Sequence, residues 1–297
     1  MRLLFLAIDC LGWPWFERHW LPELPDNLVY GKLMAPVPVT GPGWTSIFTG
    51  LTMEQHGVTD SHGRPRNGSK SFANLYGQYF TDNLPGTVGM FNVPCTFPPR
   101  GRRGDWMISG YPYPPATYPT CLLDATDYVG DVATLLAELH PAQDVGEPFW
   151  PDVLPFRDVL TLLDLIERLH MRVLSHLPVP DYLVVATTYF DRVAHAKHGA
   201  KDPDPDPFDR AARYCLEWAS RIIERYPADT IVIASDHGWN ESGPGHDEQG
   251  VWAAWGSGVY ESGRKDMANH ELRSFIEAAL SANDPRIKDR LEALGYA

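Results

Sequence analysis

The most informative stretch of this 297-residue sequence is Asp229-Thr-Ile-Val-Ile-Ala-Ser-Asp-His-Gly238. Its apolar, β-branched centre predicts a strand buried on both faces, and the Asp-His-Gly that follows predicts a polar loop at the carboxyl end of that strand. Four other short apolar runs have a similar form. The predicted strands are residues 3–8, 87–91, 182–187, 229–234 and 250–255.

Longer segments with helical spacing of apolar residues lie among these runs. The alternation favours an α/β fold in which helices cover both faces of a mostly parallel sheet. We find no linker and no internal repeat, so we expect a single domain over residues 1–297. The predicted helices are residues 44–51, 71–80, 156–177, 208–226 and 271–280.

The composition narrows the possible partners and the cellular compartment. A net charge of −13 gives no basic footprint for nucleic acid or for an anionic membrane surface. The four cysteines, at positions 10, 95, 121 and 215, form no CxxC motif, which indicates free thiols in a reducing compartment. No apolar run reaches the length of a membrane helix, and the N-terminal run ends early at Asp9. We therefore expect a soluble, cytoplasmic protein with no membrane partner.

Two proline-rich segments, residues 96–120 and 140–155, predict loop insertions in this domain. Aromatic residues such as Trp106 lie between the prolines of the first segment. Two roles remain open for these segments: they cover the surface, or they line and cover a substrate site.

Acidic residues follow three of the predicted strands. Asp9 directly follows the first strand, Asp191 comes shortly after the run 182–187, and Asp236 and His237 follow the run 229–234. The carboxyl ends of parallel strands meet at one edge of a sheet, where ligands bind in open α/β folds. Carboxylates gathered at such an edge repel one another unless cations neutralise them. The sequence therefore predicts a metal site.

Two further histidines extend this set. His195 is four residues after Asp191, so the two share a face if the segment is helical, and His246 precedes the run 250–255. The set contains carboxylates and imidazoles without a thiolate, which suits Zn²⁺, Mn²⁺ or iron better than Mg²⁺. Each part alone has a structural alternative: a helix cap at Asp9, a surface pair of Asp191 and His195, and a turn at residues 236–238.

A candidate nucleophile lies in the stretch Pro36-Val-Pro-Val-Thr-Gly-Pro-Gly-Trp-Thr-Ser46. Pro42 is acceptable in a first helical turn, so Thr40 is predicted just before a helix N-terminus, whose N–H groups favour anions. A hydroxyl bound to a metal ion at this position can ionise and attack an electrophile. The alternative is that Thr40 only caps the helix.

Four stretches, taken in order, resemble the alkaline phosphatase superfamily. In particular they resemble its branch of type I phosphodiesterase/nucleotide pyrophosphatase-like proteins and predicted phosphohydrolases and phosphomutases. Weaker similarities at residues 91–99 and 291–296 extend the resemblance over most of the chain. The four stretches are Leu6-Ala-Ile-Asp9, Val39-Thr-Gly-Pro-Gly-Trp-Thr-Ser-Ile-Phe-Thr-Gly-Leu-Thr-Met-Glu-Gln-His-Gly-Val58, Asp191-Arg-Val-Ala-His195 and Ser235-Asp-His-Gly238.

The resemblance implies a three-layer α/β/α sandwich, alkaline phosphatase-like, with two divalent metal ions that are usually zinc. It further implies that the Thr40 hydroxyl attacks phosphorus and forms a phospho-threonine, which water then hydrolyses. Three carboxylates facing two divalent ions leave a small positive charge that attracts an anionic ester. One ion would bind Asp191, His195 and His246, and the other would bind Asp9, Asp236, His237 and the Thr40 hydroxyl.

One position departs from the family pattern. Nucleotide pyrophosphatases carry an asparagine three residues after the nucleophile, where it supports a phosphoryl oxygen, and this chain has Gly43 there. The donor to that oxygen must then be the backbone N–H of Gly41 or of a residue after it, or the side chain of an arginine such as Arg192. Nucleotide specificity therefore does not follow from the resemblance.

The leading hypothesis is a two-metal hydrolase that acts on a small-molecule phosphate ester, with phosphodiesters or pyrophosphates as the first class of substrate. A phosphomonoesterase of the same superfamily is the alternative within the enzyme class. The rival from another class is a catalytically inactive, metal-bearing binding protein. Only the missing asparagine supports that rival, and the complete set of candidate metal ligands argues against it.

Overall fold

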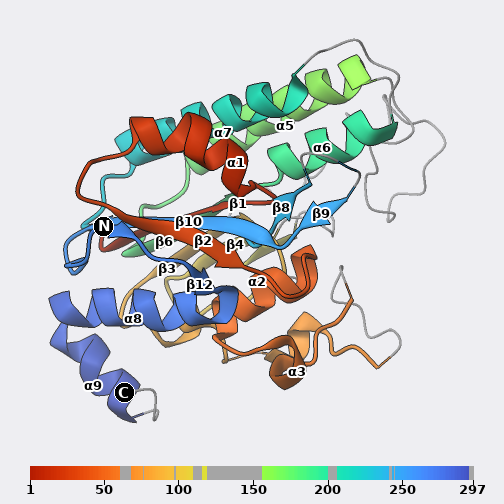
Figure 1. Cartoon of the computed structure of the whole chain (residues 1–297). Helices are drawn as coiled ribbons and strands as arrows, with labels where there is room; N and C mark the ends of the chain where they lie inside the picture. The colour runs from red at the N-terminus through yellow and green to blue at the C-terminus, as the bar shows by residue number, and fades with distance from the viewer. Residues whose placement is uncertain are drawn as a thin grey trace.

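The computed structural model describes residues 1–60, 68–75, 77–96, 98–109, 116–118, 156–199, 206–240, 243 and 245–293. These residues form three layers, with a central sheet between two layers of helices (Figure 1). The α/β fold and the mostly parallel sheet expected from the sequence are confirmed. The predicted insertion at residues 140–155 lies outside the described residues, as do residues 97, 110–115 and 119–120 of the one at residues 96–120.

The described strands form one large mixed sheet and a small two-stranded one. In the large sheet the order is β11-β2-β10-β7-β1-β6-β3-β4-β5, and β12 also pairs with β2. Its centre, from β7 to β4, is parallel, whereas β10 and β5 run antiparallel to their neighbours. The strands are β1 Leu3–Ile8, β2 Val29–Met34, β3 Val88–Val93, β4 Trp106–Ser109, β5 Ala116–Tyr118, β6 Tyr182–Thr187, β7 Thr230–Ala234, β8 Gly238–Trp239, β9 His246–Asp247, β10 Gln249–Gly256, β11 Gly263–Arg264 and β12 Met267–Ala268.

Helices α1, α5, α6 and α7 cover one face of this sheet, and α2, α3, α8 and α9 lie on the other side (Figure 1). Short 3₁₀ turns and one π-helical turn at Phe16–Trp20 connect some of the elements. Among the described residues, no helix combines the length and apolar character that a bilayer crossing requires. The helices are α1 Trp13–Trp15, α2 Thr40–Thr49, α3 Met53–His56, α5 Phe156–Leu174, α6 Tyr189–Gly199, α7 Pro207–Arg225, α8 Leu272–Asn283 and α9 Pro285–Ala293.

Strand β1 shows why the central strands are apolar along their whole length. Leu4 and Leu6 pack into the core under α5 and α7, and Leu3 and Phe5 pack into the core under α2 and α8. Successive side chains of a strand point to opposite faces, so a strand between two helical layers buries every residue. Each β1 side chain is fully buried. The two cores fix the register that brings the strand ends to one edge.

Three expectations about local structure are wrong in part. Residues 71–80 form no continuous helix, because Gly77 has a φ of +80° and only 3₁₀ turns flank it. Helix α2 begins at Thr40, four residues earlier than expected, because Val39 is the extended N-cap residue and Pro42 is tolerated in the first turn. The segment 96–120 is not all loop: the apolar run Trp106–Ser109 pairs with β3 as β4, and β5 pairs with β4.

Candidate metal centre

The strand ends bring the predicted acidic residues together as expected. Asp9 follows β1 and Asp236 follows β7, and the pairing of Ala7 with Ala234 sets these two carboxylates side by side. Asp191 lies in the first turn of α6, directly after β6, which pairs with the other side of β1. All three carboxylates are at least nine-tenths buried. The carboxyl edge of the parallel sheet is therefore a buried acidic cluster.

Asp191, His195 and His246 form the first group of side chains. Asp191 Oδ1 lies 3.4 Å from His195 Nε2 and 3.3 Å from His246 Nε2, and the two ring nitrogens are 3.2 Å apart. His246 Nδ1 lies 2.9 Å from the Pro38 carbonyl. Because a carbonyl only accepts, Nδ1 carries the hydrogen, and the Nε2 lone pair faces the group.

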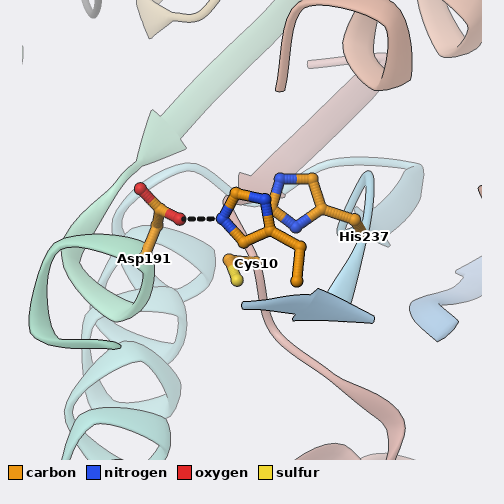
Figure 2. A group of neighbouring side chains, drawn as sticks. Cys10, Asp191 and His237 are labelled. Atoms are coloured by element: carbon orange, nitrogen blue, oxygen red, sulfur yellow. Dashed lines mark ion pairs between the residues drawn. The ribbon is translucent and has the colours of Figure 1, made fainter. Parts of the chain in front are cut away.

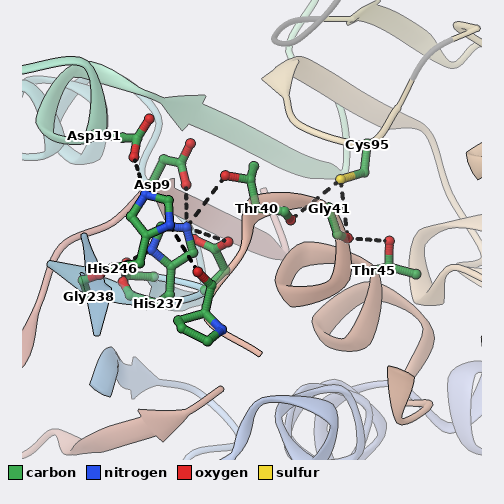
Figure 3. Close-up of polar contacts among 12 residues, drawn as sticks. Asp9, Thr40, Gly41, Thr45, Cys95, Asp191, His237, Gly238 and His246 are labelled. Carbon is green, nitrogen blue, oxygen red and sulfur yellow. Dashed lines mark hydrogen bonds and ion pairs between the residues drawn. The ribbon is translucent and has the colours of Figure 1, made fainter. Parts of the chain in front are cut away.

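His237 is the centre of the second group (Figure 3). Its Nε2 atom lies 3.4 Å from Asp236 Oδ2, 3.7 Å from Asp9 Oδ1 and 3.4 Å from the Thr40 hydroxyl. Its Nδ1 atom is 3.3 Å from the Gly238 carbonyl, so the hydrogen is again on Nδ1. The Thr40 hydroxyl thus belongs to a group with two carboxylates and one imidazole.

The spacing of these atoms fits metal ions. Ligands about 2.0–2.1 Å from a tetrahedral zinc ion lie about 3.3 Å from one another, close to most of the separations in both groups. Asp9 Oδ1 and Oδ2, Asp191 Oδ1 and both carboxylate oxygens of Asp236 are buried and accept no hydrogen bond within the described part of the chain. Buried carboxylate oxygens without donors are costly unless cations neutralise them. Both groups can therefore hold a divalent ion.

The pKa values reflect this crowding. Burial and the Asp191 charge raise the pKa of Asp9 to about 7, and burial and Asp9 raise the pKa of Asp236 well above its usual range. Burial also acts to raise the pKa of Asp191, but the neighbouring imidazoles of His195 and His246 hold it well below its usual range. Burial lowers the pKa of His237 to about 3, so this imidazole is neutral. A neutral imidazole beside competing carboxylates suits cation binding.

Thr40 lies at the head of α2, where the first N–H groups have no partner in the helical ladder. It is the first residue of the helix rather than the residue before it. The Cys95 thiol lies against the carbonyls of Thr40 and Gly41, at 3.8 and 3.7 Å, and holds this turn from the β3 side. The N–H group of Gly41 is thus part of a helix N-terminus that favours an anion next to the Thr40 hydroxyl.

The glycine at position 43 has a structural cause. A Cβ atom at residue 43 would lie 2.8 Å from Asp236 Oδ2 and 3.0 Å from Asp236 Cβ. An asparagine therefore does not fit here, because α2 packs directly against this carboxylate. Arg192, the other predicted substrate contact, is half-buried on α6, and its charge acts on His195.

Sequence reasoning missed Cys10 in this centre and His56 in the helix α2 support behind it. Cys10, which directly follows Asp9, is buried beside Asp191 and His237 (Figure 2), although the predicted set contained no sulfur. His56 joins α3 to α2: its Nε2 lies 3.0 Å from Ser46 Oγ, and its Nδ1 accepts from the Val58 N–H at 3.0 Å. The proximity of Cys10 to a predicted ligand was the available signal.

The family model described as type I phosphodiesterase/nucleotide pyrophosphatase matches residues 3–254. The chain belongs to this family. Membership confirms the resemblance found in the sequence and supports an ester hydrolase of the phosphodiesterase or phosphatase type. The family is typically metal-dependent, in keeping with the two groups of candidate ligands.

Solved structures similar to this phosphodiesterase-family chain match it at low sequence identity and with TM-scores below 0.5. Alkaline phosphatase from the Antarctic bacterium TAB5 is 14% identical with a TM-score of 0.44, over 95% of this chain and 99% of that one. Murine ectonucleotide pyrophosphatase/phosphodiesterase 5 is 13% identical with a TM-score of 0.42, over 81% and 59%. Lipoteichoic acid synthase LtaP from Listeria monocytogenes is 10% identical with a TM-score of 0.45, over 94% and 71%. No curated protein matches this sequence.

Proposed function

We propose that this chain hydrolyses small-molecule phosphoric esters, with diesters or pyrophosphates as the preferred class, and that Thr40 is its nucleophile. One observation carries the proposal: the Thr40 hydroxyl lies 3.4 Å from His237 Nε2, at a helix N-terminus and beside two groups of buried ligand atoms. A structural threonine cap would not need three buried carboxylates around it.

The proposed centre holds two divalent ions, with zinc as the proposed metal, one in each group. Such ions, when bound, neutralise the carboxylates and lower the pKa of a coordinated hydroxyl. The first group comprises Asp191, His195 and His246. The second comprises Asp9, Asp236, His237 and the Thr40 hydroxyl.

Each of the following residues has a separate role in the proposed reaction. The Thr40 hydroxyl gives its proton to solvent and Oγ1 attacks phosphorus; the bond to the leaving-group oxygen breaks, that oxygen takes up a proton from solvent and departs, and a phospho-threonine forms. Water later cleaves the Thr40–phosphorus bond, which releases the phosphoryl group and restores the Thr40 hydroxyl. The Gly41 N–H and the head of α2 receive a phosphoryl oxygen as its charge grows. Arg192 supplies a cation on the α6 side of the centre. Gly43 leaves room for α2 to keep Thr40 close to Asp236.

The proposal is tested with Thr40→Ala and Thr40→Ser in the zinc-loaded protein, assayed on an aryl phosphodiester and on the matching aryl phosphomonoester. We expect Thr40→Ala to lose at least about a thousandfold in kcat and to keep its metal, whereas Thr40→Ser keeps measurable turnover. Thr49→Ala is the matched control, because Thr49 is buried in the same helix and its hydroxyl makes local bonds, to the Thr45 carbonyl and from the Leu51 N–H.

The outcomes separate the hypotheses. Faster turnover of the diester supports the diesterase, and faster turnover of the monoester supports a phosphomonoesterase at the same site. Metal binding without any Thr40-dependent turnover would support the inactive binding protein. Equal turnover by Thr40→Ala and the unmodified chain would refute Thr40 as nucleophile.

A further inference from the structure

A buried thiol lies against both groups of the candidate metal centre. Cys10 Sγ, an Asp191 oxygen, and one ring nitrogen each of His237 and His246 all lie within 4.8 Å of one another. In Figure 2 the sulfur lies beside Asp191 and His237. The Cys10 side chain is fully buried. A sulfur atom at this distance from three candidate ligands is within reach of an ion that they share.

The backbone holds the thiol there at a cost. Cys10 has a φ of +67°, in the left-handed region. A residue with a Cβ atom is about 1–2 kcal/mol less stable in this conformation than in the right-handed one, whereas glycine adopts both about equally well. Such strain persists where the surroundings impose it, and it concentrates at functional sites. The turn between β1 and α1 would be satisfied by glycine, so the side chain itself needs an explanation.

A second observation points to an ion near this sulfur. Asp191 Oδ1 is buried and makes no hydrogen bond of normal geometry with the described residues: its neighbours are His195 Nε2 at 3.4 Å and His246 Nε2 at 3.3 Å, and it faces the same space as Cys10 Sγ. Asp191 is only 4% exposed, so water does not supply the missing donor freely. A cation between the carboxylate and the sulfur satisfies both atoms.

We infer that Cys10 Sγ is an additional ligand, as a thiolate, of the ion held by Asp191 and His246. The inference rests on the proposed two-metal function and adds to it a soft ligand in a set that is otherwise oxygen and nitrogen. On binding, the thiol proton leaves to solvent. A thiolate favours Zn²⁺, Co²⁺ or Cd²⁺ over Mn²⁺ and Mg²⁺, so this residue sets the metal preference of the site.

The test uses Co²⁺ as the probe, with the full chain and two variants. Cys10→Gly removes the sulfur and suits the positive φ, so it keeps the fold, and Cys10→Ser provides a second, near-isosteric change. Cys215→Ser is the matched control, because Cys215 is also fully buried but lies on α7. We expect the near-ultraviolet thiolate-to-Co²⁺ charge-transfer band in the unmodified chain and in Cys215→Ser, and its loss in both Cys10 variants. Competition between Zn²⁺ and Mn²⁺ should shift toward Mn²⁺ by about tenfold or more in Cys10→Gly.

The d–d bands of bound Co²⁺ test the metal centre, and the charge-transfer band tests the role of Cys10. Co²⁺ bound by the unmodified chain with visible d–d bands but no charge-transfer band would overturn the role of Cys10 and leave the metal centre standing. A charge-transfer band that survives in Cys10→Gly would overturn it as well. Failure of the unmodified chain to bind Co²⁺ at all would overturn the proposed metal centre and this inference with it.

Discussion

Replacing Asp9 by asparagine should stabilise the metal-free protein and destabilise the metal-loaded one. In the metal-free chain, burial and Asp191 raise the pKa of Asp9 to about 7 from its usual 3.8. The folded state therefore holds a proton that the unfolded state has already lost. Stability from this carboxyl is greatest at low pH and is lost as the pH rises from about 4 to about 7. Asparagine keeps the shape and does not titrate.

The two pKa values set the size of the effect. At about 1.4 kcal/mol per pKa unit, the titration of Asp9 lowers the free energy of unfolding by roughly 2–3 kcal/mol between pH 5 and pH 8. Asp9 raises the pKa of Asp236, so part of this change belongs to the coupled pair and not to Asp9 alone. The advantage of Asp9→Asn over the unmodified chain should grow by roughly 2–3 kcal/mol over this range.

The assay is urea unfolding at pH 5, 6, 7 and 8 in the presence of a chelator, repeated with saturating zinc. Asp26→Asn serves as control, because Asp26 is exposed at the surface. With zinc, the sign should reverse, because Asp9→Asn lacks a ligand and loses the stability that bound metal confers. A difference that does not change with pH in the chelated proteins would refute the crowded, desolvated carboxylate cluster.

Two further predictions test the surroundings of the centre. Gly43→Ala should weaken metal binding by about tenfold or more, because the new Cβ meets Asp236. Gly243→Ala is the control: its Cβ would meet Asn240 at 3.5 Å as the nearest of the described residues, and it should not change the zinc affinity measured by competition with a chelating dye. Trp106→Ala should lower the free energy of unfolding by about 3–5 kcal/mol in urea titrations, because Trp106 is 3% exposed within β4. The variant should keep the ratio of diester to monoester turnover. A changed ratio would instead make Trp106 part of the substrate site.

The central strands could be predicted because each is a short apolar run with two buried faces. The expected runs 3–8 and 182–187 agree with β1 and β6 to the residue. β2 was missed because Val29–Met34 alternates buried and half-buried residues and includes Gly31 and Lys32. Trp106–Ser109 was hidden among prolines and glycines, since local composition predicts a loop and only pairing with β3 makes it a strand.

The part of the candidate site that lies at the ends of the parallel strands could be predicted from the sequence. Asp9, Asp191 and Asp236 each follow a parallel strand, so topology alone brings them to one edge. Long-range placement was not readable: His246 is positioned by the Pro38 carbonyl, 208 residues away in sequence. The position of Cys10 depends on a left-handed backbone turn, which periodicity does not reveal.

Metal content per folded chain tests the two-ion centre most directly. The protein is loaded with zinc, freed of excess by gel filtration, and its zinc is measured against protein concentration. We expect about two zinc ions per chain. His195→Ala should lose the ion of the first group, and His237→Ala should lose the ion of the second group. Zinc near zero in the folded, unmodified chain would contradict the account, because the buried carboxylates would then have a purely structural role.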